Sequence, residues 1–210
     1  MLKAVKLYKT FGTRVLFKNV NFEIYPASIH LLQGNNGVGK STLFKIITGL
    51  LEQSSGTIEC ELDISQIGYL AHNSFMYPQM TALENIEFWH TLHTKKSAHK
   101  DEYMSVLEKF GLSKFAYEKV QIFSRGMVQK LSLARLKMQN PKLYLLDEPS
   151  TGLDVSAKKM LIDEIIENKR KNASVFWISH NIEYDMQYAD FLHILENKTL
   201  TSKEIEKGTL

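Results

Sequence analysis

The stretch from Leu31 to Thr42 carries the side chains whose types and spacing are best suited to chemistry. Its Gly34, Gly39, Lys40 and Ser41 fit the pattern G-x-x-x-x-G-K-S/T, in which backbone N–H groups of a loop surround the phosphates of a nucleotide. Glycines allow the left-handed dihedrals that such a loop needs, and they leave no Cβ between the backbone and the phosphates. The stretch therefore predicts a phosphate-binding loop.

The polar groups of this loop have distinct expected roles. The ammonium group of Lys40 suits the outer phosphates, and the hydroxyl of Ser41 suits a Mg²⁺ ion bound with them. A helix that begins near Lys40 would direct its N-terminus at the anion, so its dipole and free N–H groups would add to the attraction. The other predicted nucleotide contacts of the loop are Gly34, Asn35, Asn36, Gly37, Val38, Gly39 and Thr42.

Two carboxylates follow a second apolar run. The segment from Leu143 to Leu146 has the composition of a buried strand, and Asp147 and Glu148 come directly after it. In open α/β sheets, ligands bind at the carboxyl ends of the strands. Asp147 fits a Mg²⁺-associated acid that acts with Ser41, and Glu148 fits a general base for the water that attacks the terminal phosphate. The alternative is a pair of solvated carboxylates at a strand end.

Three further side chains have both a functional and a structural interpretation. His180 follows the apolar run from Ser174 to Ser179, so it is expected at the same sheet edge, as a partner of the terminal phosphate or as a structural histidine. Phe11 lies in a short turn, where its ring either packs in the core or stacks on an adenine. Asp154 precedes a helix expected from about Val155, which it could merely cap.

A second candidate anion site is remote in sequence from the phosphate loop. Ser124 precedes a helix in which Met127, Leu131, Ala134 and Met138 share one face. Capped by Ser124, the N-terminus of this helix would attract an anion. The alternative is an ordinary N-cap.

The elements that must position these side chains are expected in one domain, residues 1–210. The opening is mostly β, the strand from Ser28 to Leu32 leads into the phosphate loop, and a helix from about Lys40 to Gly49 follows. Residues from about 73 to 123 have the pattern of a helical insert, whose second helix is expected from Tyr103 to Phe110.

Composition excludes several classes of protein. The chain is 44% hydrophobic, and its 26 basic and 23 acidic residues are too balanced to imply a nucleic-acid partner. Cys60 is the only cysteine, which rules out an internal disulfide and suits a reducing compartment. No secretory signal and no run of roughly 20 apolar residues is present. We expect the chain to be soluble alone, so a membrane process would need a partner chain.

The order of these segments resembles the ATP-binding cassette (ABC) transporter family over nearly the whole chain. The matching segments are Phe11 (adenine-stacking aromatic), Gly34 to Thr42 (phosphate loop), Phe123 to Met127 (signature), Leu143 to Glu148 (acidic strand), Ser150 to Asp154 (the loop after it) and His180 (switch histidine). The resemblance implies an α/β fold of the ABC type, a P-loop NTPase with a mixed β core, an antiparallel β subdomain and a helical subdomain insert. It also implies hydrolysis of ATP with Mg²⁺.

The resemblance further implies partners. Two copies would form a head-to-tail homodimer with ATP, in which Ser124 and Gly126 of one copy cover the ATP held by Lys40 of the other, and Asp154 would belong to the same nucleotide-contacting set. Integral membrane transporter subunits would receive the motions through the helical insert. The resemblance therefore places the chain in the cytoplasm, peripheral on the inner face of the cell membrane.

Two positions depart from the family pattern. The signature usually reads L-S-G-G-Q, whereas residues 123–127 here read F-S-R-G-M, with Arg125 in place of a glycine. The glutamine that usually follows Gly-Tyr-Leu is replaced by His72. We assign His72 to the surroundings of Mg²⁺ as a candidate metal-site residue, and packing at the interface with a membrane partner is the alternative.

Within the family, Tyr69 to His72 and Met80 to Trp89 resemble the ATPase subunit of the bacterial haem exporter of cytochrome c maturation. This resemblance predicts that ATP hydrolysis drives export through separate membrane subunits, with haem as a candidate cargo. Other exporters share the Ser-Arg-Gly-Met form, so the ATPase of another ABC-2-type exporter is the alternative. A soluble regulatory cassette protein and a phosphate-loop kinase are further alternatives: the first usually has two cassettes or a long coiled-coil insertion, and the second needs an acceptor pocket.

Overall fold

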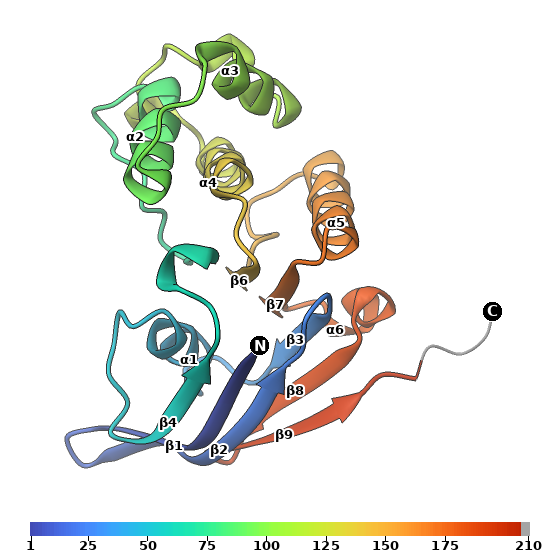
Figure 1. Cartoon of the computed structure of the whole chain (residues 1–210). Coiled ribbons are helices and arrows are strands. Elements are labelled where there is room, and N and C mark those ends of the chain that lie inside the picture. The colour runs from blue at the N-terminus through green and yellow to red at the C-terminus, as the bar shows by residue number, and fades with distance from the viewer. Residues whose placement is uncertain (207–210) are drawn as a thin grey trace.

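Two β-sheets organise residues 1–206, the part of the chain described by this computed structural model (Figure 1). The larger sheet has six strands in the order β5-β6-β7-β3-β8-β9, all parallel except β9, which runs antiparallel to β8. The smaller sheet has three antiparallel strands in the order β2-β1-β4. The strands are β1 (Leu2–Phe11), β2 (Arg14–Ile24), β3 (Ile29–Gln33), β4 (Ser55–Cys60), β5 (Ile67–Leu70), β6 (Leu143–Asp147), β7 (Ser174–Ile178), β8 (Phe191–Glu196) and β9 (Thr199–Glu204).

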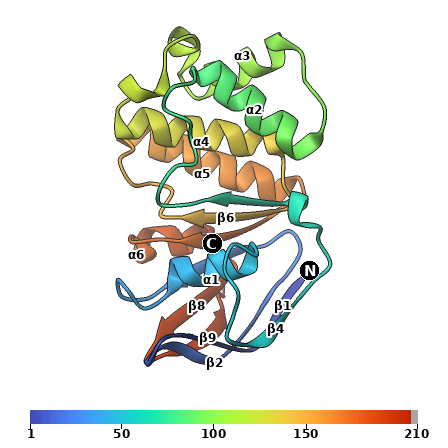
Figure 2. The same ribbon diagram turned by 90° about the vertical axis from the view of Figure 1, so that its left-hand side faces the viewer.

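Helices cover both faces of the larger sheet. Helices α4 and α5 lie on one side, with α2 and α3 stacked beyond α4, and α1 lies on the other side, toward the smaller sheet (Figure 2). Within residues 1–206, no helix is both long and apolar enough to span a bilayer. The helices are α1 (Lys40–Ile47), α2 (Ala82–Thr94), α3 (Lys100–Lys109), α4 (Arg125–Gln139), α5 (Val155–Arg170) and α6 (Ile182–Asp185), with short 3₁₀ turns at Ile64–Gln66, Ser113–Phe115, Val120–Ile122 and Met186–Tyr188.

The central strands are continuous apolar runs because both faces of the sheet are covered. Every residue of β6 and β7 is buried. Successive side chains alternate between two cores: Trp177 packs into the core shared with α2 to α5, and Phe176 packs into the core shared with α1 and the smaller sheet. The register of the parallel strands makes them end together at one edge of the sheet.

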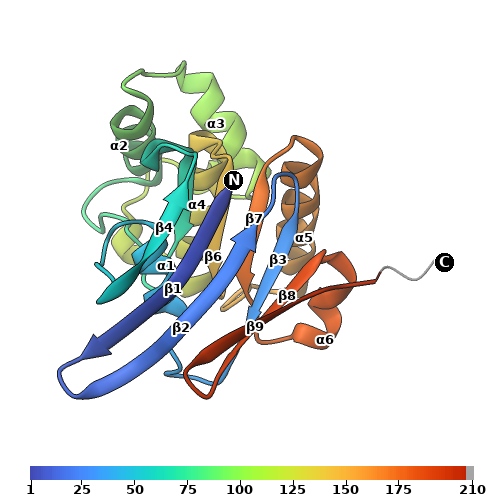
Figure 3. The same ribbon diagram turned by 60° about the horizontal axis from the view of Figure 1, so that its bottom comes forward.

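The hairpin of β1 and β2 extends beside β8 and β9 (Figure 3). Its turn needs the positive φ of +56° at Gly12, and the Thr10 hydroxyl donates to the carbonyl oxygens of Gly12 and Arg14 at 3.0 Å each. The backbone N–H of Lys18 donates to the carbonyl of Lys198 at 2.7 Å, which ties the two sheets together. This arrangement fixes the position of Phe11, the last residue of β1.

The expected α/β fold, with a mixed core sheet and a separate antiparallel sheet, is confirmed. Helices α2 and α3 both lie between residues 73 and 123. The start expected for the second of them was wrong, because α3 begins at Lys100 rather than Tyr103. Apolar periodicity begins only at Tyr103, whereas the first turn is polar and is capped by His99, whose backbone N–H is accepted by Glu102 at 3.1 Å.

Two histidines lie side by side in the core, on the adjacent strands β3 and β8. The His30 Nδ1 and His193 Nε2 atoms are 2.8 Å apart, and the outer ring nitrogens reach the hydroxyls of Ser28 and Ser202, each at 2.7 Å. Burial, reinforced by the charge of His193, lowers the pKa of His30 to about 3, and burial lowers the pKa of His193 to about 4. At neutral pH both rings are therefore uncharged in the folded protein.

This buried pair makes the fold sensitive to acid. Both folded-state pKa values lie below the value of about 6.5 for an unfolded histidine, so only the unfolded state takes up protons as the pH falls from about 6.5 toward 4. The contribution of the pair is complete above about pH 6.5 and is lost on acidification. Urea denaturation should show the unfolding free energy falling by roughly 1–2 kcal/mol per histidine between about pH 7 and pH 5.

Variants separate this effect from general acid sensitivity. His193→Gln removes one titrating group from the core and should give a shallower pH dependence, whatever its stability at neutral pH. His99→Gln, at an exposed histidine, should keep the slope of the wild type. An unchanged slope in His193→Gln would contradict the assignment.

Candidate functional site

The loop between β3 and α1 has the backbone geometry of a phosphate cradle. Gly37 and Gly39 have positive φ values of +76° and +116°, and a Cβ at Gly39 would lie 2.9 Å from the side chain of Leu16. Lys40 is only 6% exposed, and its Nζ donates to the carbonyl oxygens of Gly34 at 2.6 Å and Asn35 at 3.2 Å. Burial lowers the pKa of Lys40, while the nearby acidic groups Glu148 and Asp147 oppose this shift. The ammonium group is therefore hydrogen-bonded to carbonyl oxygens of the loop. In a nucleotide complex, phosphate oxygens would replace these carbonyls as its acceptors.

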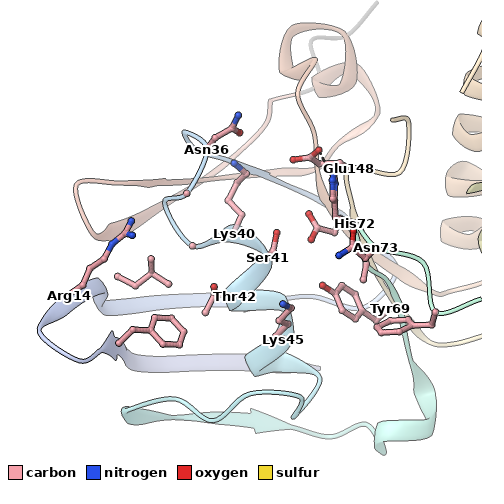
Figure 4. A pocket seen from close by; sticks show the side chains of 17 residues that line it. Arg14, Asn36, Lys40, Ser41, Thr42, Lys45, Tyr69, His72, Asn73 and Glu148 are labelled. Atoms are coloured by element: carbon pink, nitrogen blue, oxygen red, sulfur yellow. Dashed lines mark ion pairs between the residues drawn. The ribbon is translucent and has the colours of Figure 1, made fainter. Parts of the chain in front are cut away.

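An open pocket of about 850 Å³ lies over this loop (Figure 4). Its walls come from the β1–β2 hairpin, α1, the end of β5 and the end of β6. Of the residues expected at the site, those that line it are Phe11, Asn36, Gly37, Gly39, Lys40, Ser41, Thr42, His72, Asp147 and Glu148. Phe11 is 51% exposed, so its ring is accessible to a planar ligand, and Lys9 Nζ lies 4.7 Å from its centroid.

Asp147, the last residue of β6, is a buried carboxylate that lacks hydrogen bonds. It is 2% exposed, and neither of its oxygens has a hydrogen-bond partner of normal geometry among the described residues. Burial raises the pKa of Asp147, and the nearby Ser41 hydroxyl opposes the shift more than any other group. Burying carboxylate oxygens without hydrogen-bond donors costs folding free energy, so a ligand that binds Asp147 would recover part of that cost.

Glu148 lies between His72 and His180, two histidines that are far apart in the sequence. Its Oε1 is 2.7 Å from His180 Nε2, and its Oε2 is 3.5 Å from His72 Nδ1. Glu148 also has a φ of +54°, a left-handed conformation that is uncommon outside glycine and that clusters at functional sites. The ends of β5, β6 and β7 therefore bring His72, Glu148 and His180 together; His72 and Glu148 line the pocket, whereas His180 contacts Glu148 from outside the lining.

Comparison with known proteins decides the family to which this site belongs. The ABC transporter family matches residues 17–151. The chain belongs to this family. It is 34% identical over 214 residues to the lantibiotic transport ATP-binding protein SrtF of Streptococcus pyogenes, across 98% of this chain and 92% of that protein. It is 30% identical over 193 residues to the cytochrome c biogenesis ATP-binding export protein CcmA of Paramagnetospirillum magneticum, across 87% of this chain and 88% of that protein.

A solved structure gives the same result for the fold. The structure of an ATP-binding subunit of an ABC transporter superposes with a TM-score of 0.89 at 26% identity, covering 98% of this chain and 90% of that one. This chain is therefore an ABC ATPase, the subunit of an ABC transporter that binds and hydrolyses ATP.

Three expected site residues of the ABC ATPase, Ser124, Gly126 and Asp154, form a second group that does not line the pocket. Ser124 caps α4, accepting the N–H of Met127 at 3.2 Å, and Asp154 caps α5, accepting the N–H of Ala157 at 2.8 Å. A Cβ on Gly126 would lie 2.8 Å from the carbonyl oxygen of Gly152, so the first turn of α4 is in close contact with the loop before α5. Hydrogen bonds from the Ser156 hydroxyl and, with a smaller effect, from the Ala157 N–H lower the pKa of Asp154 to about 2. Three of the loop residues, Gly34, Asn35 and Val38, also lie outside the pocket lining.

The pocket contains residues that the sequence did not single out. Arg14 and Lys45 add positive charge, and Tyr69, Asn73 and Phe75 form the wall near β5 (Figure 4). Tyr69 had a signal in the sequence, because it lies near the end of an apolar run like the run that precedes Asp147. Arg14 had none, because only the hairpin geometry brings it to the pocket.

Removal of the Lys40 ammonium group tests the cradle. A ligand that binds only the native state at about one hundred times its Kd stabilises it by about 2.7 kcal/mol. We expect this stabilisation by Mg-ATP to be nearly abolished in Lys40→Ala, measured by thermal unfolding with and without nucleotide. Lys18→Ala, at an exposed lysine on β2, is the control and should respond like the wild type. A full stabilisation of Lys40→Ala would contradict the assignment.

Proposed function

We propose that this ABC ATPase powers export through separate membrane-spanning subunits. The observation that carries the proposal is an exposed aromatic patch beside the pocket, formed by Phe75, Tyr77, Phe88, Trp89 and Leu92. Four of these five side chains are 38% to 57% exposed. Contiguous exposed apolar surface of this kind marks interaction sites.

The aromatic patch is built as a firm surface. Tyr77 contacts Phe88 and Trp89 with ring centroids 5.1 and 6.0 Å apart, and the guanidinium of the buried Arg135 lies 5.2 Å from the Trp89 ring. Trp89 also donates from its indole N–H to the carbonyl of Phe75 at 3.2 Å. A preorganised aromatic surface loses little side-chain entropy on binding. It therefore suits an apolar segment of a partner subunit.

The patch is part of the segment expected to transmit motion. In this proposal residues 1–210 form one ABC ATPase domain, and residues from about 73 to 123 are its helical insert. The insert contributes α2, which carries Phe88, Trp89 and Leu92. Docked there, the chain would lie in the cytoplasm against the inner face of the membrane, held by its integral membrane partners.

The pocket supports a specific division of roles in ATP hydrolysis. Lys40 contacts the outer phosphates and Phe11 stacks on the adenine. Ser41 and Asp147 would hold Mg²⁺, since one carboxylate, a hydroxyl and nucleotide phosphates suffice for this ion. The ion would supply charge neutralisation on the phosphates. The orphaned, buried oxygens of Asp147 fit this role.

The base in this scheme is Glu148. It takes a proton from the water whose oxygen attacks the γ-phosphorus, the bond from that phosphorus to the bridging oxygen breaks, and ADP and phosphate leave. His180 Nε2 lies 2.7 Å from Glu148 Oε1, and in this scheme His180 is the partner of the terminal phosphate. His72 is the other neighbour of the base and lies near the metal-binding position.

The second group of site residues supports dimerisation. Ser124, Gly126 and Asp154 lie outside the pocket of their own chain, with Ser124 exposed at the N-terminus of α4. In the proposed head-to-tail homodimer, this group of one copy covers the ATP bound in the pocket of the other. The N-terminus of α4 offers free N–H groups for the phosphates.

Two kinds of export have support from the relatives. SrtF, the relative at 34% identity, is a lantibiotic transport protein, which favours an exporter of the ABC-2 type. CcmA, at 30% identity, is an export protein of cytochrome c biogenesis, which supports haem as the second candidate. The segments from Tyr69 to His72 and from Met80 to Trp89 carry the resemblance to the haem exporter.

Loss of the base is the test of the hydrolytic scheme. Glu148→Gln keeps the size of the side chain and removes its basicity, so steady-state ATPase activity should fall by about 10²–10⁴-fold while ATP binding persists. The variant should accumulate as an ATP-bound dimer in gel filtration. Glu183→Gln, at an exposed carboxylate of α6, should hydrolyse ATP normally. Near-normal turnover of Glu148→Gln would refute its role.

Capture of a membrane partner tests the proposed function itself. The tagged chain, purified from detergent-solubilised membranes, should retain a multi-span protein that stimulates its ATPase activity. Phe88→Ala removes one exposed ring of the aromatic patch and should weaken this association by about 30-fold, the effect of a central interface residue worth about 2 kcal/mol. Tyr184→Ala, at an exposed tyrosine of α6, should bind normally. Equal retention by both variants would exclude the patch.

A further inference from the structure

The hydroxyl of Tyr69 is a buried donor without a partner. Tyr69 lies on β5 and is 7% exposed, and among the described residues its hydroxyl has no hydrogen bond. A buried hydroxyl without a hydrogen bond destabilises the protein, whereas the same ring without the hydroxyl would not. A buried hydroxyl without a hydrogen bond indicates that its hydrogen bond forms only when a ligand is bound.

The neighbouring group that could accept a hydrogen bond from the Tyr69 hydroxyl is the carboxylate of Asp147. The backbone pairs Tyr69 with Leu145 on the neighbouring strand β6, and residues 145 and 147 share one face of that strand. Burial and, after it, the neighbouring Asp147 raise the pKa of the Tyr69 hydroxyl, although the two groups do not complete a hydrogen bond of normal geometry. An unpaired buried donor thus faces an unpaired buried acceptor.

The ring of Tyr69 is held so that the hydroxyl keeps this direction. It meets Phe44 of α1 edge-on, with centroids 6.3 Å apart at 83°, and Phe75 with centroids 6.1 Å apart at 60°. Figure 4 shows Tyr69 reaching into the pocket from the side opposite Lys40, with Ser41 between them. The ring therefore cannot turn its hydroxyl to the solvent without breaking these contacts.

We propose that Tyr69 is a positioning residue for the metal-holding carboxylate. Its hydroxyl donates to one oxygen of Asp147, so that the other oxygen is presented to Mg²⁺ beside Ser41. The proposal rests on the proposed metal role of Asp147. It explains why both groups are buried and unpaired together: each is satisfied when the carboxylate shifts to bind the ion.

Other donors near Asp147 have different tasks. The Nζ of Lys40 is occupied by the carbonyls of Gly34 and Asn35, and phosphates would take their place. The Ser41 hydroxyl is expected on the ion itself. Tyr69 is left to fix the carboxylate, and partners of this kind typically change metal affinity by about 10–100-fold.

The test measures metal affinity directly. Mn²⁺ serves as the probe, titrated with electron paramagnetic resonance into the full chain that carries a non-hydrolysable ATP analogue. Tyr69→Phe should bind Mn²⁺ about 10-fold more weakly. Its affinity for the analogue in EDTA should match that of the wild type, and the Mg²⁺ concentration for half-maximal ATPase activity should rise while the rate at saturating Mg²⁺ is retained.

Tyr144→Phe is the matched control. Tyr144 lies on β6 and is 3% exposed, but it packs in the other core, away from the pocket. Its variant should bind Mn²⁺ within about twofold of the wild type. Tyr69→Phe should also melt no lower than the wild type without nucleotide, because it loses only an unpaired hydroxyl.

The outcomes separate the possibilities. Unchanged Mn²⁺ affinity in Tyr69→Phe, with normal binding by the wild type, would overturn the proposal and leave the proposed function intact. A lowered melting temperature of the free variant, or equal loss of analogue binding in EDTA, would show that the hydroxyl has a structural role and would also overturn it. Equal Mn²⁺ affinity of the analogue with and without the wild-type chain would refute the metal role of Asp147 itself.

Discussion

The register of four parallel strands is the constraint on which the site depends. Ile178 of β7 pairs with Leu32 of β3 on one side and with Asp147 of β6 on the other, and β5 continues the same alignment. The phosphate loop and the segments that carry His72, Glu148 and His180 therefore leave the sheet at one edge. A slip of β6 by one residue would turn the Asp147 side chain to the opposite face, because side chains alternate along a strand. Burial of both faces of the sheet is what forbids that slip.

The two buried charges of the pocket are satisfied very differently. The ammonium group of Lys40 already has two carbonyl partners, so a phosphate that binds it replaces hydrogen bonds rather than adding them. The oxygens of Asp147 have none, and its raised pKa reflects that burial. A ligand that satisfies Asp147 therefore recovers desolvation free energy that Lys40 cannot return. A cation next to Asp147 would therefore add a favourable contribution to nucleotide binding that is separate from the charge of Lys40.

Sequence was informative wherever the signal is local. The glycine spacing around Lys40 and the carboxylates after the apolar run of β6 predicted the loop and the strand end, because backbone geometry and burial set those patterns over a few residues. The approach of His72 to Glu148 depends on strand register, and the position of Arg14 at the pocket depends on the hairpin, so no local pattern revealed them. The left-handed φ of Glu148 was equally hidden, since nothing in its residue type favours it.

The path from the pocket to the aromatic patch is short and anchored at both ends. Tyr69 contacts Phe75, the first aromatic of the patch, and in our proposal its hydroxyl donates to Asp147. Further along the same segment, the fully buried Asn85 of α2 accepts the Tyr77 N–H at 2.7 Å and donates to the Tyr77 carbonyl at 3.0 Å. The segment between β5 and α2 is thus fixed to the sheet at one end and to α2 at the other. In our proposal, a shift at Asp147 would act on Tyr69 and on its contact with Phe75, the first aromatic of the patch.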